Sequence, residues 1–301
     1  MEKTRAITTS LLNSANCQIL TDDSCCLNNE EQMKLGVEMI PFLATINQLE
    51  DPLRNLLSKK EFVLFVGTTP SLSIINDTVR DAVTTLDEKD KSLRASERIY
   101  IIDTSCFSGG LGFLVTYLAE FFNSGSHSLN DIRTYAQFLS NHIAHFFVEP
   151  SPKRWNDLIY VPRTGPVNYS GGRFRGNKAI YNYLGTNLND NAYNPKEKVW
   201  VCYSELREEA KNLARHLKKH CPDSRIDMSH SINPHSVASL SDDVIACFYL
   251  STEVRPDEPS ETYDKTQYAA IDRKNKIAKY NITKMTRIAQ AFHKNHFCPE
   301  F

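Results

Sequence analysis

The segment GTTPS, residues 67–71, carries hydroxyl groups that could hold an anion. It directly follows EFVLFV, an apolar run typical of a buried strand, and it supplies the side chains of Thr68, Thr69 and Ser71. A helical pattern begins after it, and the first turn of a helix offers unpaired N–H donors and a dipole that favours negative charge. Threonine and serine are also common N-cap residues, so a purely structural role stays open.

A second polar turn lies in IIDTSCFSGGLG, residues 101–112, where Ser108 precedes two glycines. The segment lacks the P-loop pattern and the Gly-x-Gly-x-x-Gly spacing of dinucleotide sites. It also lacks the Gly-x-Ser-x-Gly elbow of hydrolases, although Cys106 could act as a nucleophile if a distant histidine lay beside it. We expect a strand-to-helix turn in which Ser108 contributes to a ligand site and Cys106 is a small buried residue.

Two further segments supply charged or titratable groups. SGGRFRG, residues 170–176, places Arg173 beside flexible glycines, and a guanidinium fork suits a carboxylate or a phosphate as well as the surface of a hairpin loop. The polar segment SHSINPHSVASLSDD contains His230 and His235, either of which can reach a ligand from a loop. No spacing typical of a metal site is present, so neither a metal nor another cofactor is expected.

The composition argues against a nucleic-acid-binding, a membrane-spanning or a disulfide-rich protein. The 301 residues have a formal net charge of -1, which gives no chain-wide field for nucleic acid, and none is expected as a partner. No window approaches 18 consecutive apolar residues, and the first residues lack the apolar core of a signal peptide. The eight cysteines show no disulfide or zinc framework. These features predict a cytoplasmic protein with reduced thiols.

The order of apolar segments predicts an α/β fold. Strands are expected at 17–20, 36–42, 61–66 and 98–104, with helices over 74–86, 111–122 and 128–147. Strands that alternate with helices indicate a parallel sheet. The first domain is therefore predicted to span residues 1–147.

A change to Pro, Gly, Tyr and Asn near residue 150 predicts a second α/β domain at 148–252. Its expected strands are 198–204, 225–231 and 243–251, with a helix over 204–220. Residues 253–301 are interpreted as a linker and a basic helix. Within them, 269–297 carries seven Lys or Arg against one Asp. Such a helix can lie on an anionic membrane or dock on the protein with its basic face in solvent.

The order of these segments resembles the DegV family of bacterial fatty-acid-binding proteins. The resemblance covers residues 17 to about 251 and rests on ILTDDS, GTTPSLS, IIDTSCFSGGLG, SGGRF and the late loop around NPHS. The chain would be a divergent member with a shortened N-terminal domain and an extra basic C-terminal tail.

The resemblance implies two α/β domains, with a parallel sheet in the first, a mixed sheet in the second and a ligand cleft at the junction. It implies a carrier without catalytic residues that binds a long-chain fatty acid and presents its carboxylate to a separate fatty acid kinase. Thr68 and Thr69 fall where the family has its serine pair, His235 falls on the late-loop histidine, and Arg173 falls on the Gly-Gly-Arg arginine. We add Ser71 and Ser108 to these expected ligand-binding residues.

Apolar residues of the first domain could line a tunnel for the acyl chain or fill an ordinary core; they are Phe113, Leu114, Phe121, Phe138 and Phe147. Each buried CH2 of a ligand would contribute about 0.8 kcal/mol. Two other functions stay open. One is an enzyme that transfers acyl or phosphoryl groups at the domain junction, and the other is a scaffold or effector that acts through the basic C-terminal helix.

Overall fold

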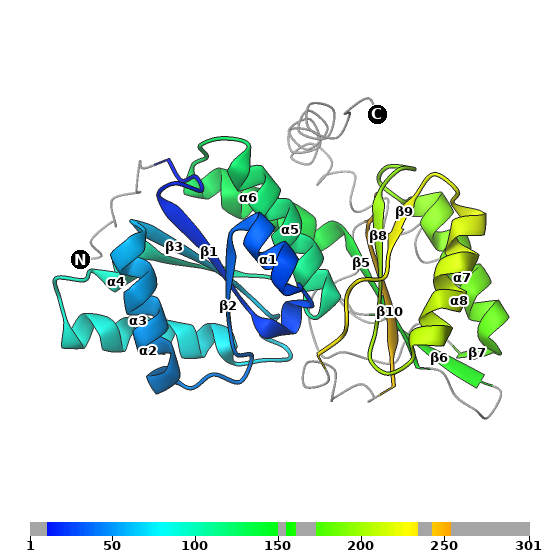
Figure 1. Cartoon of the computed structure of the whole chain (residues 1–301), viewed down its shortest axis with the longest axis horizontal. Coiled ribbons are helices and arrows are strands. Elements are labelled where there is room, and N and C mark those ends of the chain that lie inside the picture. The colour runs from blue at the N-terminus through cyan, green and yellow to red at the C-terminus, as the bar shows by residue number, and fades with distance from the viewer. Residues whose placement is uncertain (1–10, 150–154, 161–172, 234–242, 254–301) are drawn as a thin grey trace, which may run out of the picture.

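The computed structural model describes residues 11–149, 155–160, 173–233 and 243–253, which form two sheets with helices packed on them (Figure 1). The predicted basic helix at 269–297 and the loop that contains His235 lie outside these described residues. The first sheet is wholly parallel, in the order β2-β1-β3-β4, as the alternation of strands and helices predicts. Its strands are β1 (Cys17–Asp22), β2 (Val37–Ile40), β3 (Phe62–Gly67) and β4 (Ile99–Asp103).

Helices cover both faces of this sheet. One hydrophobic cluster joins one face of the strands to α2 (Ile46–Lys59) and α3 (Ile75–Lys89), with the short α4 (Ala95–Arg98) leading into β4. The other face packs against α5 (Gly109–Asn123) and α6 (Leu129–His142), and α1 (Asn29–Leu35) contacts α5. A single 3-10 turn, η1 (Asp23–Cys25), connects β1 to α1. The apolar residues of α3 recur at helical spacing, which is why this helix is recognisable in the sequence.

The second sheet is mixed, in the order β7-β6-β5-β10-β8-β9. Neighbouring strands are antiparallel except for β8 and β9, which are parallel. One hydrophobic cluster joins one face to α7 (Asn177–Asn191) and α8 (Arg207–His220). The strands are β5 (Ile143–Glu149), β6 (Trp155–Tyr160), β7 (Arg173–Arg175), β8 (Lys198–Tyr203), β9 (Arg225–Asp227) and β10 (Ile245–Leu250).

The sequence predicts a helix over residues 128–147, but the helix in the structure, α6, is shorter. It begins as expected, because Ser128 Oγ accepts a hydrogen bond from the N–H of Asp131 (3.1 Å) in a capping box, but it ends at His142. The next seven residues form β5 between β6 and β10. The run IAHFFVE continues the helical apolar pattern and also fits a buried strand, and pairing with distant strands decides between the two.

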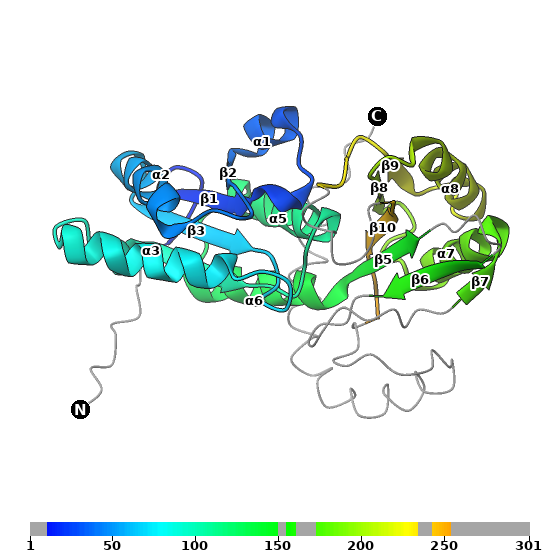
Figure 2. The same cartoon turned by 90° about the horizontal axis from the view of Figure 1, so that it is seen from below.

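Helix α5 is the core element that the two sheets share. All of its residues except Glu120 and Asn123 are buried, and it contacts β5, β8 and β10 of the second sheet (Figure 2). Glycine permits this approach: a Cβ on Gly110 would lie 1.9 Å from His145 Nε2, and one on Gly112 would lie 1.9 Å from the carbonyl oxygen of Cys25. The Gly-Gly-x-Gly sequence after Ser108 is therefore a packing surface, since substituents there would collide with the second sheet and with η1.

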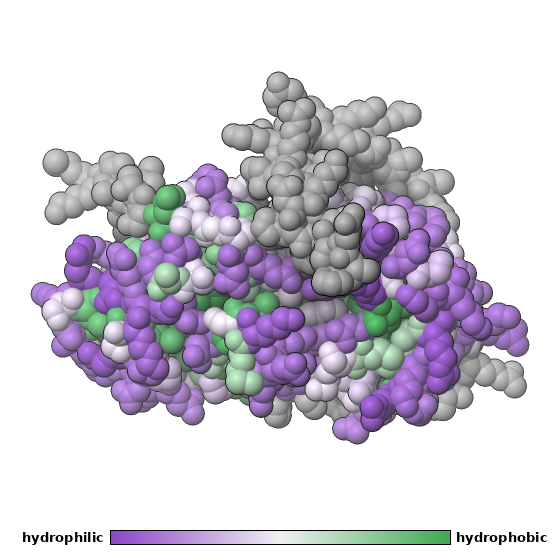
Figure 3. All heavy atoms as spheres, turned by 45° about the horizontal axis from the view of Figure 1, so that its top comes forward, coloured by the Kyte–Doolittle hydropathy of each residue, from purple (hydrophilic) through white to green (hydrophobic). Residues whose placement is uncertain are grey.

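Among the residues that Figure 3 colours, hydrophilic side chains predominate, with smaller hydrophobic areas between them. Large exposed hydrophobic side chains among the described residues are well separated along the chain; they are Leu11, Met33, Leu43 and Ile74. Within the described part of the chain, every helix is too short or too polar to cross a lipid bilayer.

Candidate site at the carboxyl ends of β1 and β3

The order of the first sheet defines one place where a ligand is expected. The chain leaves β1 to form β2 on one side and then returns to form β3 on the other side of β1. In open α/β sheets, ligands bind outside the carboxyl ends of the strands at such a reversal of strand order. Here that edge carries the turn after β1, which begins at Asp22, and the turn after β3, which contains Thr68 and Thr69.

Asp22 holds these two turns together. Its Oδ2 accepts the backbone N–H of Thr68 (2.8 Å), and its Oδ1 accepts the Thr68 hydroxyl (3.1 Å). Oδ1 also accepts the N–H of Ser24 (3.1 Å) and the Ser24 hydroxyl, and the hydroxyl oxygens of Ser24 and Thr68 lie 2.7 Å apart. The three side chains are buried, and burial raises the pKa of Asp22 while the bonds from Ser24 and Thr68 oppose that rise. The Thr68 hydroxyl thus braces the turn.

Thr69 and Ser71 continue the same turn toward the surface. The Thr69 N–H donates to the carbonyl of Cys106 (2.9 Å), which joins this turn to the one after β4. The hydroxyl oxygens of Thr69 and Ser71 lie 3.1 Å apart, and Ser71 is exposed. The two hydroxyls can therefore converge on one oxygen of a carboxylate without breaking the Asp22 network.

Ser108 contacts Cys26, the residue that follows η1, and is fully buried. Its φ of 52° is in the left-handed region, and its hydroxyl oxygen lies 3.4 Å from the Sγ of Cys26. The thiol of Cys202 and the hydroxyl of Ser108 both hydrogen-bond to the thiol of Cys26 and hold its pKa below the usual value, although burial opposes this. Because η1 and Cys26 reach both Thr68 and Ser108, one short segment bridges the two polar turns that the sequence singles out.

The remaining predicted residues are placed as follows. Arg173 begins β7 at one edge of the second sheet, and its side chain lies outside what the structure describes, as does the whole of His235. Cys106 is buried, with its Sγ 3.9 Å from the hydroxyl of Ser140. The structure thus brings Thr68, Thr69 and Ser71 into one turn and places Ser108 one segment away.

The loop after β9, in the second domain, contacts this edge of the first sheet. The Asn233 side-chain amide donates to the carbonyl of Asp23 (3.4 Å), and His230 Nδ1 lies 3.3 Å from the carbonyl oxygen of Cys26. The sequence identifies His230 as a residue that can reach a ligand from a loop. It assigns no role to Asp22 and Ser24, which lie in the segment ILTDDS. The position of Asp22 at the end of an apolar run could have indicated that its side chain holds the following turn.

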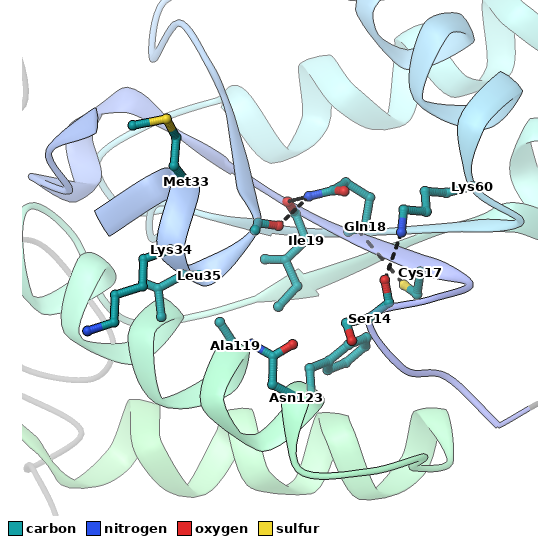
Figure 4. A pocket seen from close by; sticks show the side chains of 12 residues that line it. Ser14, Cys17, Gln18, Ile19, Met33, Lys34, Leu35, Lys60, Ala119 and Asn123 are labelled. Atoms are coloured by element: carbon teal, nitrogen blue, oxygen red, sulfur yellow. Dashed lines mark hydrogen bonds between the residues drawn. The ribbon is translucent and has the colours of Figure 1, made fainter. Parts of the chain in front are cut away.

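A cavity of about 220 Å³ lies elsewhere, at the amino end of β1 (Figure 4). It lies among β1, α1 and α5, and its lining includes Ile19, Lys34 and Phe122. Nearby, Lys60 donates to the carbonyl of Ser14 (2.7 Å). Because β1 runs from Cys17 to Asp22, this cavity is at the opposite end of the strand from the Asp22 network.

No protein-family profile matches the chain, and no curated protein matches it in sequence. Solved structures do match its fold. DegV, a fatty acid binding protein from Bacillus subtilis, aligns with a TM-score of 0.64 at 13% identity, over 79% of this chain and 100% of its own. A stearic-acid-binding protein from Eubacterium ventriosum aligns with a TM-score of 0.63 at 14% identity, over 78% of this chain and 98% of its own.

A third structure is the fatty acid kinase B3 protein of Streptococcus pneumoniae, loaded with linoleic acid. It has a TM-score of 0.60 at 12% identity and covers 78% of this chain and 99% of its own. The strand pairing of this chain confirms the predicted parallel first sheet and mixed second sheet, and the alignments confirm the fold that the sequence resemblance implies. The chain has the two-domain α/β fold of the DegV fatty-acid-binding proteins.

Proposed function

We propose that this protein is a carrier that binds a long-chain fatty acid, with the carboxylate at the carboxyl ends of β1 and β3. The observation that carries the proposal is the pair of hydroxyls on Thr69 and Ser71, which lie 3.1 Å apart at the point where the strand order reverses. Two hydroxyl donors suit one carboxylate oxygen, and hydrogen bonds to a charged group are the stronger kind. The shared fold supports the acyl class of ligand, since neighbours of that fold carry stearic and linoleic acid.

The acyl chain would enter the apolar layer around α5. The five residues considered as a tunnel lining, Phe113, Leu114, Phe121, Phe138 and Phe147, all belong to one buried cluster that extends into both sheets. Rings within it stack closely, as for Phe107 and Phe147 with centroids 5.0 Å apart. An acyl chain must therefore displace these rings from one another, and burial of its CH2 groups at about 0.8 kcal/mol each offsets that cost.

A carrier of this kind keeps the carboxylate near the surface, where a second protein can reach it. Thr69 is almost buried whereas Ser71 is exposed, so the proposed carboxylate site opens to solvent on the Ser71 side. We extend the proposal to presentation of the bound acid to a separate fatty acid kinase, in the cytoplasm. Arg173 and His235 stay predicted contributors to the carboxylate site, and Ser108 is predicted to shape its base.

Replacing Thr69 with valine should weaken oleate binding by roughly 10- to 100-fold, the effect of losing one hydrogen bond to a charged group. Valine matches threonine in shape, so the turn and its backbone bond to Cys106 stay in place. Isothermal titration calorimetry with oleate measures the change, and Thr84→Val on the exposed side of α3 serves as the matched control. Equal oleate affinity in wild type and Thr69→Val would place the carboxylate elsewhere.

A further inference from the structure

Two cysteine thiols from different domains meet beside the start of α5. Cys26 follows η1 in the first domain, and Cys202 lies in β8 of the second, 176 positions further along the chain. The Cys202 thiol hydrogen-bonds to the Cys26 sulfur. Two consecutive residues reach both sulfurs: the Ser108 hydroxyl lies 3.4 Å from Cys26 Sγ, and a Cβ on Gly109 would lie 2.8 Å from Cys202 Sγ. The packing of α5 between the sheets thus brings the two thiols together.

The cysteines next to this pair, in the chain and in the sheet, face elsewhere. Cys25 Sγ lies 3.3 Å from the sulfur of Met39 on β2. Cys247 lies on β10, which pairs with β8, but its side chain belongs to the cluster under α7 and α8. Cys202 belongs to the cluster around α5, on the opposite face of the sheet. Cys202 is therefore the thiol that is placed to react with Cys26.

Hydrogen-bond donors converge on the sulfur of Cys26. As a thiol, Cys26 can donate to the carbonyl of Ser24 (3.4 Å). As a thiolate, it accepts from the Cys202 thiol, the Ser108 hydroxyl and the N–H of Asn233. The bond from Cys202 does most to hold the pKa of Cys26 below its ordinary value, and burial opposes it. Since the thiolate is the form of cysteine that reacts as a nucleophile, these donors favour reaction at Cys26.

His230 supplies a positive charge beside this sulfur. Its Nδ1 lies 3.3 Å from the carbonyl oxygen of Cys26, and its ring stacks on Trp200. Burial lowers the pKa of His230, but Asp227 and Glu31 outweigh burial and raise the pKa above its ordinary value. Their carboxylates lie 3.5 Å from Nε2 and 3.4 Å from Nδ1. The protonated ring therefore stabilises a negative charge on Cys26.

We propose that Cys26 and Cys202 are a redox modification site, at which hydrogen peroxide forms a disulfide between the two domains. The Cys26 thiolate attacks one peroxide oxygen, so that an S–O bond forms, the O–O bond breaks and hydroxide leaves. The Cys202 sulfur then attacks the sulfur of this sulfenic acid, the S–O bond breaks, and the hydroxyl leaves with the Cys202 proton as water. Two thiols and one hydrogen peroxide thus give one disulfide and two water molecules.

Exposure and protonation assign the two roles. Cys26 is 8% exposed whereas Cys202 is fully buried, so a molecule as small as hydrogen peroxide reaches Cys26 first. Burial raises the pKa of Cys202, which stays a thiol until the sulfenic acid forms beside it. A sulfur of low pKa next to a resolving thiol is typical of redox-sensing cysteines. Disulfides of cytosolic proteins are usually transient, and a dithiol should reduce this one again.

The test treats the reduced full-length protein with one equivalent of hydrogen peroxide, blocks the remaining thiols with N-ethylmaleimide and maps unreduced peptides by mass spectrometry. Cys26→Ser removes the nucleophile, and Cys25→Ser is its matched control. Cys202→Ala removes the resolving thiol, and Cys247→Ala, in the neighbouring strand and equally buried, is its matched control. Dimedone, which reacts with sulfenic acids, is added to a second sample of each protein.

Wild type and both controls should lose two thiols and give a cross-link between the peptides of Cys26 and Cys202, which dithiothreitol reverses. Cys202→Ala should instead give a dimedone adduct at Cys26. Cys26→Ser should lose its thiols at least roughly 10-fold more slowly than Cys25→Ser, since the reactive thiolate is gone.

The peptide map of wild type decides the question even where a variant does not fold. No loss of thiols, a cross-link between another pair, or even oxidation across all eight cysteines would overturn the proposal. Equal rates of thiol loss in Cys26→Ser and Cys25→Ser would overturn it as well.

Discussion

Replacing Asp22 with alanine is expected to lower the free energy of unfolding by about 4 kcal/mol, because it leaves the two buried backbone N–H donors of Ser24 and Thr68 without their acceptor, and each such unsatisfied donor costs about 1–3 kcal/mol. Asp22 accepts four hydrogen bonds, two from Ser24 and two from Thr68, and all three residues are buried. Without the carboxylate, the N–H groups of Ser24 and Thr68 lose their acceptor, whereas the two hydroxyls, whose oxygens lie 2.7 Å apart, can still bond to each other. Chemical denaturation monitored by circular dichroism measures the loss.

The control is Asp51→Ala, an exposed position in α2, where a change within about 0.5 kcal/mol is expected. The Asp22 variant should also lose oleate affinity, since the turn that carries Thr69 is no longer fixed. A loss of less than 1 kcal/mol in the Asp22 variant would show that the network does not hold the two turns together.

The second prediction is that protonation of Glu197 makes the stability of the protein depend on pH. This carboxyl is nearly buried between the domains and accepts a hydrogen bond from the Tyr117 hydroxyl of α5. Burial raises its pKa from 4.5 to about 7, while Tyr117 and the backbone and side chain of Lys198 act in the opposite direction. The folded protein therefore binds a proton at Glu197 that the unfolded chain has already lost, in the window between pH 4.5 and 7.

Stability from this group is fully present below pH 4.5 and is lost as the pH rises through 7, with a total change of about 3 kcal/mol. Glu197→Gln should remove this dependence, because the amide stays neutral and its oxygen can still accept the Tyr117 bond. The free energies of unfolding of both proteins at pH 4.5 and pH 8 measure this pH dependence. The variant should be about 3 kcal/mol more stable than wild type at pH 8, and the two proteins should be about equally stable at pH 4.5.

The exposed Glu88 on α3, changed to glutamine, is the matched control for Glu197. Other groups titrate in the same window, so the quantity to compare is the difference between each variant and wild type. A Glu197→Gln variant that loses stability with pH as steeply as wild type would show that this carboxyl is ionised throughout.

The sequence predicts the first sheet well, because its strands are short apolar runs with polar turns after them. EFVLFV becomes β3, and the segment 98–104 becomes β4, next to it in a parallel sheet. The helix α2 was not predicted, although its leucines at 49, 53, 56 and 57 lie on one buried face. The switch from α6 to β5 at Ile143 depends on strand pairing across about 100 residues, which local pattern does not contain.

In the candidate site, too, some residues are predictable from the sequence, whereas the contacts between them depend on how distant segments pack. Thr68, Thr69 and Ser71 were recognisable because hydroxyl residues follow an apolar run. The tie between Asp22 and Thr68 joins positions 46 residues apart, and only the pairing of β1 with β3 brings them together. The contact of His230 with Cys26 joins the two domains, so it depends on the packing of α5 between the sheets.

The most direct test of the proposed function is native mass spectrometry of the purified full-length protein, before and after incubation with oleate and with oleyl alcohol. We expect a bound acyl chain that leaves as a free fatty acid on denaturation, uptake of one equivalent of added oleate, and much weaker uptake of the alcohol. We further expect that Thr69→Val loses the preference for oleate. A protein that carries no acyl chain and takes up no oleate would contradict the central claim.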